Sequence, residues 1–67
     1  MPLYLVYNNN GDILSEKDQK NIEEMIKRWN YKLCAKTSFG LIFRTEDIKP
    51  AEDFIEELNK NGYKIRI

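Results

Sequence analysis

Two residues of this 67-residue chain could carry covalent or proton-transfer chemistry in a sequence that contains no histidine. The first is Cys34, the only cysteine, which has Lys32 and Lys36 two positions away on either side. Residues two apart on a β-strand point to the same face, so both ammonium groups are expected beside the sulfur. Nearby cations stabilise a thiolate, which makes Cys34 a candidate reactive thiol. The simpler interpretation is a small residue on an open sheet surface.

The second candidate is Pro2, which would carry a free secondary amine once Met1 is removed. The opening stretch MPLYLVY, followed by GDILS, resembles the start of the N-terminal-proline tautomerase superfamily, especially its haloacrylate dehalogenase branch. The resemblance covers about the first 30 residues and implies an enzyme that uses Pro2 as its catalytic base. The arginine that this family commonly places near the start of its first helix is missing, since Arg28 is the first arginine here. The alternative is a proline tolerated at the first position of a strand.

Other chemistry finds no support in the residue types. One cysteine and no histidine cannot supply a zinc site built from thiolates and imidazoles. Aligning Gly11 with the glycine of a calcium loop puts Val6 and Lys17 at positions that need carboxylates. Phosphate-binding, dinucleotide and nucleophile-elbow motifs are absent from the sequence. We therefore expect no metal and no cofactor.

Periodicity and turn residues predict the elements that position these groups. Residues 3–7 are apolar and β-prone, and the NNNGD stretch that follows favours a turn. Ser15, with Asp18 three residues on, is typical of a helix N-cap. The helix after it would bury a stripe formed by Ile22, Met25, Ile26 and Trp29. Asn30 would end this helix in a left-handed conformation.

The second half of the chain has the same kinds of strand, turn and helix signals. Strands are predicted over residues 31–36 and 41–44, joined by the TSFG turn at 37–40. Pro50 suits the first turn of a second helix, and Gly62 suits its end. The apolar stripe of this helix consists of Ala51, Phe54, Ile55 and Leu58. Residues 63–67 alternate as a fourth strand.

The resulting order, β-α-β-β-α-β, predicts one α+β domain over residues 1–67. A four-stranded antiparallel sheet with both helices packed on one face satisfies the two amphipathic helices. This is the ferredoxin-like arrangement.

The charges balance in number, 11 basic against 11 acidic, but not in position. None of the acidic residues falls in a predicted strand; they are Asp12, Glu16, Asp18, Glu23, Glu24, Glu46, Asp47, Glu52, Asp53, Glu56 and Glu57. Five basic residues do fall in strands, namely Lys32, Lys36, Arg44, Lys64 and Arg66.

Strand alternation then predicts where these five cations point. The residues expected to face the helices are Leu33, Leu41, Phe43, Ile65 and Ile67. All five cations would then face the open side of the sheet, together with Cys34, Ile42, Tyr4 and Val6. The prediction is a basic sheet face opposite an acidic helical face.

Such a face could dock an acidic protein surface or the phosphates of a nucleic acid. The alternative is protection of the sheet edges, because lysines on edge strands block edge-to-edge aggregation. The TSFGLIFR stretch also resembles the third-strand motif of RNA-recognition domains through Phe39, Gly40 and Ile42, and Tyr4 would be the first-strand stacking ring. That motif's leading basic-glycine pair and final aromatic residue are missing here, and an outward Phe39 would turn Arg44 into the core.

The function predicted from the sequence is a small non-catalytic binding or regulatory module, such as an inhibitor. Its surface would be centred on Tyr4, Val6, Ile42 and Arg44 and ringed by Lys32, Lys36, Lys64 and Arg66. A homodimer through the open face or an edge strand is a further expectation, because a chain of this size has little core to spare. The single cysteine, the absence of a leader-like segment and an apolar run of only five residues predict a cytoplasmic protein without a membrane partner.

Overall fold

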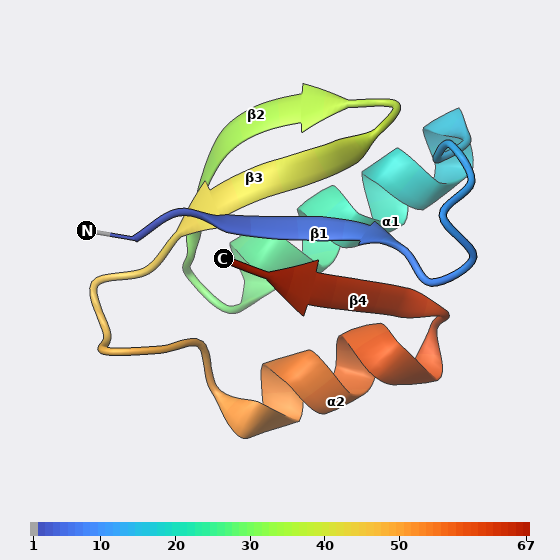
Figure 1. Cartoon of the computed structure of the whole chain (residues 1–67). Coiled ribbons are helices and arrows are strands. Elements are labelled where there is room, and N and C mark those ends of the chain that lie inside the picture. The colour runs from blue at the N-terminus through green and yellow to red at the C-terminus, as the bar shows by residue number, and fades with distance from the viewer. Residues whose placement is uncertain (1) are drawn as a thin grey trace.

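A computed structural model describes residues 2–67 and has the predicted order of elements (Figure 1). These are β1 (Tyr4–Asn8), α1 (Glu16–Arg28), β2 (Lys32–Thr37), β3 (Gly40–Arg44), α2 (Glu52–Lys60) and β4 (Tyr63–Arg66). The strands form one antiparallel sheet in the order β2-β3-β1-β4, so β2 and β4 are its edges. The two helices pack against one face, which confirms the ferredoxin-like α+β fold.

Local signals set the helix ends. The Ser15 Oγ accepts a hydrogen bond from the Asp18 backbone N–H at 3.1 Å, as a capping residue does. Asn30 follows α1 with a φ of 62°, and Gly62 follows α2 with a φ of 86°. Pro50 was expected in the first turn of α2, but Ala51 keeps an extended backbone and is the N-cap. Pro50 therefore lies just outside the helix.

The core lies between the helices and one face of the sheet. From the helices it receives Ile22, Met25, Ile26, Phe54 and Leu58, all of them buried. The Tyr31 ring stacks on Phe43 at 5.5 Å between ring centres and meets Phe54 edge-on at 5.0 Å. Its hydroxyl accepts a hydrogen bond from the Ala51 N–H at 3.0 Å, which ties the start of β2 to the start of α2. Ile67, expected in this layer, follows the end of β4 and is 83% exposed.

The predicted orientation of β1 is wrong. Tyr4 lies opposite Phe43 and Val6 lies opposite Leu41, and directly paired residues share one face of a sheet. Tyr4 is only 7% exposed and Val6 is fully buried, so both face the helices. The first four residues of β1 are apolar on both faces, and a continuous apolar run does not reveal which alternate set is buried.

A bulge in β2 overturns the predicted orientation of Lys36. Leu33 pairs with Phe43, but the next pair joins Ala35 to Ile42, which leaves Cys34 as the extra residue. The alternation reverses after this point, so Lys36 pairs with Leu41 and turns to the helical side. There its Nζ lies 3.1 Å from the Glu23 Oε1 in α1. Lys32, before the bulge, keeps the predicted orientation.

Candidate binding face of the sheet

The side of the sheet away from the helices has an apolar row that crosses β2, β3 and β1 and ends at a cation on β4. The register joins Ala35 in β2 to Ile42 in β3, Ile42 to Leu5 in β1, and Leu5 to Arg66 in β4. Directly paired residues share a face, and the alternate positions in β1 and β3 are buried, so this row points away from the helices. Tyr7 joins it two positions further along β1. We call this surface the open face; its residues are Leu5, Tyr7, Ala35, Ile42, Lys32, Arg44, Lys64 and Arg66.

β1 and β3 approach each other closely at Gly40, next to the Leu5 side chain. A Cβ atom on Gly40 would lie only 2.6 Å from the Leu5 Cδ1 and 2.7 Å from the Val6 carbonyl oxygen. Glycine therefore leaves the space that the Leu5 side chain occupies above β3. The Thr37 Oγ1 stabilises the β2–β3 hairpin by accepting hydrogen bonds from the backbone N–H groups of Phe39 and Gly40, both at 3.2 Å.

Four cations border the apolar row on two sides. Lys32 and Arg44 are directly opposite each other in β2 and β3, while Lys64 pairs with Tyr7 and Arg66 with Leu5. All four side chains are exposed. None of them forms an ion pair within residues 2–67, and like charges placed directly opposite destabilise a sheet. An anion bound between Lys32 and Arg44 would relieve that repulsion.

Cations elsewhere in the molecule are mostly neutralised. Ion pairs join Lys27 and Lys36 to Glu23, and the pKa of this carboxyl is lowered because both lysines donate hydrogen bonds to it. Three more pairs are Arg28–Glu57, Lys49–Glu52 and Lys60–Glu56.

The excess negative charge lies mainly on α2. This helix has four acidic residues and one lysine, whereas α1 has four residues of each sign. The acidic helical face predicted from the sequence is therefore an acidic α2.

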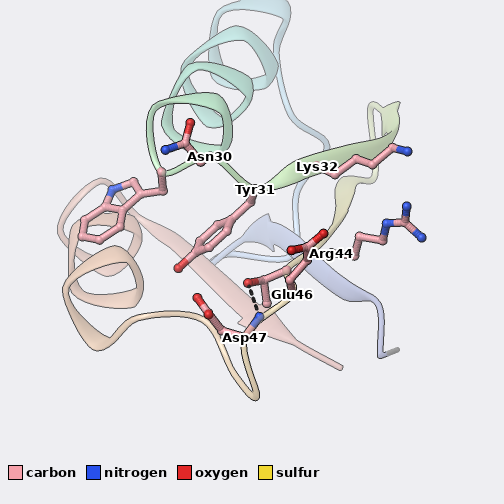
Figure 2. Close-up of a pocket in the computed structure, with 8 residues that line it drawn as sticks. Asn30, Tyr31, Lys32, Arg44, Glu46 and Asp47 are labelled. Atoms are coloured by element: carbon pink, nitrogen blue, oxygen red, sulfur yellow. Dashed lines mark hydrogen bonds between the residues drawn. The ribbon is translucent and has the colours of Figure 1, made fainter.

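A cleft of about 460 Å³ adjoins the Lys32 and Arg44 end of the sheet. It lies between the segment after α1, with Asn30 and Tyr31, and the loop after β3, with Glu46 and Asp47. Figure 2 shows Lys32 and Arg44 extending in the same direction, away from the Tyr31 ring. Lining groups of both signs make the cleft a mixed polar site, and its basic wall is continuous with the open face.

The predicted site residues separate into two groups. Ile42, Lys32, Arg44, Lys64 and Arg66 lie on the open face as expected, whereas Tyr4, Val6 and Lys36 belong to the helical side. Leu5 and Tyr7 were missed because the sequence does not show which alternate set of β1 is buried. The close approach of Gly40 to Leu5 and Val6 depends on the pairing of β1 with β3, so it cannot be read from the sequence.

Neither of the two candidate chemical groups, Cys34 and Pro2, lines the cleft beside Lys32 and Arg44. Cys34 is exposed in the bulge, and its thiol lies 3.7 Å from the Lys32 carbonyl oxygen. One of its two expected lysine neighbours, Lys36, pairs with Glu23 instead. Pro2 is exposed and precedes β1. The catalytic role of Pro2 and the reactivity of Cys34 stay predictions.

The rings expected to stack on bases are not arranged for it. Tyr4 stacks on Phe43 inside the core, with 5.5 Å between ring centres. Phe39 is 77% exposed, but it lies in the β2–β3 turn rather than on the sheet. Tyr7 is therefore the one ring among residues 2–67 that a strand presents on the open face.

Comparison with known proteins gives no further guide to function. No protein family model, no curated protein and no solved structure matches the chain. Within residues 2–67, no helix has the length and apolar character required to cross a membrane. The same residues contain no group of three or more acidic or cysteine side chains arranged to hold a metal ion.

Proposed function

We propose that this domain is a non-catalytic binding module that docks an acidic protein partner on the open face of its sheet. The observation that carries the proposal is the set of four unpaired cations around an apolar centre. In a protein of zero net charge, most other cations have a carboxylate partner, so these four stand out. Complementary charge of this kind steers association and selects partners.

The apolar centre favours a protein over a nucleic acid. Single-stranded nucleic acids are held by stacking of bases on aromatic rings, and the strands offer Tyr7 alone for that purpose. Leu5 and Ile42 are aliphatic and suit leucine-like side chains of a protein. The sequence pI of about 6.2 also lies well below the basic range typical of nucleic-acid-binding domains.

Edge protection explains only part of the pattern. Lys32, Lys64 and Arg66 are on the edge strands, where cations discourage edge-to-edge pairing. Arg44 is on β3, an inner strand, and has no edge to protect. The bulge at Cys34 lies in β2 as well, and bulges in edge strands themselves discourage pairing with another chain.

Self-association through the open face is disfavoured by the same charges. A two-fold face-to-face dimer would bring the four cations of each copy into one interface, and none of the eight described residues that define the open face carries a carboxylate. Like-charge juxtaposition of this kind costs several kcal/mol in an interface. The homodimer expected from the sequence would therefore need another surface.

Two lysines of β2 provide a matched test. Lys32→Glu reverses a charge on the open face, and Lys36→Glu makes the same change on the helical side. Binding of fluorescent poly-L-glutamate and of a single-stranded oligonucleotide would be measured by anisotropy over a salt series. We expect the polyglutamate to bind at low salt, and Lys32→Glu to weaken it about three- to tenfold while Lys36→Glu has a smaller effect.

Three outcomes would contradict the proposal. Equal loss in the two variants would show that the open face is not the site. Tighter binding of the oligonucleotide than of polyglutamate, with the same sensitivity to Lys32→Glu, would favour a nucleic-acid partner. Absence of binding to both probes at low salt would leave edge protection as the explanation of the edge cations.

A further inference from the structure

We propose that the partner presents an amphipathic α-helix with acidic flanks, which lies along β1 and β3 on the open face. This inference rests on the proposed function and specifies the partner's binding element. The open face carries basic, apolar and basic zones in that order across the sheet. Lys32 on β2 and its partner Arg44 at the end of β3 form one basic zone. Leu5 and Ile42 on the inner strands form the apolar zone, and Lys64 and Arg66 on β4 form the other basic zone.

The width of these zones fits a helix. Neighbouring strands are about 4.8 Å apart, so β2 and β4 are separated by about 14 Å. An α-helix with its side chains is about 10–12 Å wide. A helix centred over β1 and β3 would bury its apolar stripe on Leu5, Tyr7 and Ile42. Its two flanks would lie above the cations of the two edge strands.

The register also sets how the acidic residues of the helix must be spaced. Ile42 is level with Leu5, so Arg44 and its partner Lys32 are level with Leu3, the residue before β1. Lys64 is level with Tyr7 on the opposite border. Leu3 and Tyr7 are four residues apart, or about 13 Å along the strand direction, which corresponds to about nine residues of helix. We therefore expect acidic residues on opposite flanks, separated by about two and a half turns.

Other occupants match the surface less well. An added strand covers a single inter-strand spacing of about 4.8 Å and cannot reach both basic borders. The α2 helix of a second copy is acidic, but its apolar residues Phe54 and Leu58 are fully buried in its own core. It could supply charge without an apolar stripe. On the other face of this sheet, α1 and α2 already pack their apolar stripes against the strands. The partner helix would pack against the open face in the same way, which would make the sheet the middle of three layers.

Three synthetic peptides of about four helical turns would test the inference. The first has a leucine stripe with glutamates on both flanks, the second has the same composition in scrambled order, and the third has the stripe with lysine flanks. Affinity would be measured by fluorescence anisotropy, contacts by amide NMR shifts, and helix formation by circular dichroism. We expect the first peptide to bind at least tenfold more tightly than the others, to gain helicity, and to shift the amides of Leu5, Tyr7 and Ile42.

Variants of the protein give the matched control. Ile42→Glu adds a negative charge at the centre of the open face and should lower the affinity for the first peptide at least tenfold. Ile48→Glu makes the same change at a loop residue that is 96% exposed, and should leave the affinity unchanged. Lys64→Glu, at an exposed position, tests the same face if Ile42→Glu does not fold.

The outcomes separate the two proposals. Equal binding of the first and second peptides would overturn the helix inference while leaving a charge-driven docking face. Equal effects of Ile48→Glu and the open-face variants would overturn the assignment of the site. Absence of binding by both glutamate peptides and by polyglutamate would overturn the proposed function, and the helix inference would fail with it.

Discussion

Replacing Gly40 by alanine tests the strand register on which the open face depends. The added Cβ would lie 2.7 Å from the Val6 carbonyl oxygen and 2.6 Å from the Leu5 Cδ1, where ordinary contact begins at 3.4 Å. The Leu5 side chain can rotate away. The Val6 oxygen is backbone of the central strand, so β1 and β3 would have to separate by about 0.7 Å.

The expected cost follows from these contacts. Overpacking of this kind costs about 1–3 kcal/mol. Gly40 does not have a positive φ, so alanine can adopt its backbone conformation. Alanine also lowers the conformational entropy of the unfolded chain, which stabilises the fold by about 0.4–1 kcal/mol and offsets part of this cost. We expect a net loss of about 1–2 kcal/mol in the free energy of unfolding. For a domain of this size, that loss lowers Tm by about 5–15 °C.

Urea and thermal unfolding at pH 7 would measure the loss, and the Leu5→Ala background would show its origin. Removing the Leu5 side chain relieves one of the two clashes but leaves the one with the Val6 oxygen. Part of the Gly40→Ala penalty should therefore persist in the double variant. Unchanged stability in both backgrounds would refute the close approach of β1 and β3, and with it the register that puts Leu5 beside Ile42.

Three further predictions concern a hydrogen bond between a strand and a helix, a helix cap and the β2 bulge. The hydroxyl of the buried residue Tyr63 donates a hydrogen bond to the Asp18 Oδ1 at 2.8 Å, and this bond lowers the pKa of the Asp18 carboxyl. Tyr63→Phe should therefore reduce the free energy of unfolding by about 1–2 kcal/mol at pH 7. Because the Asp18 pKa is lowered in the fold, this penalty should be complete above about pH 4 and shrink as the pH falls through the folded pKa; a penalty independent of pH in urea unfolding would contradict the assignment. Ser15→Ala removes the N-cap of α1 and should cost about 1 kcal/mol by the same assay, and a neutral result would refute the capping role. Deleting Cys34, the unpaired bulge residue, should preserve the β2–β3 pairs seen by NMR, whereas a shifted register would show that the bulge lies elsewhere.

The sequence by itself determined the local structure and the fold. The Ser15 cap, the left-handed Asn30 and Gly62, and the apolar stripes of both helices act between neighbouring residues, so their signals can be read along the chain. Alternation also predicted the faces of β3 and β4, because each strand places charged side chains on one side only. That was enough to predict Arg44, Lys64 and Arg66 on the open face.

Strand pairing alone decided the remaining part of the site. In β1 both alternate sets are apolar, and only the pairing with Phe43 and Leu41 selects Tyr4 and Val6 for the core. In β2 the extra residue at Cys34 reverses the alternation, which sends Lys36 to Glu23. Burial and register are properties of several strands together, because a side chain faces the core only relative to the strands and helices that cover it.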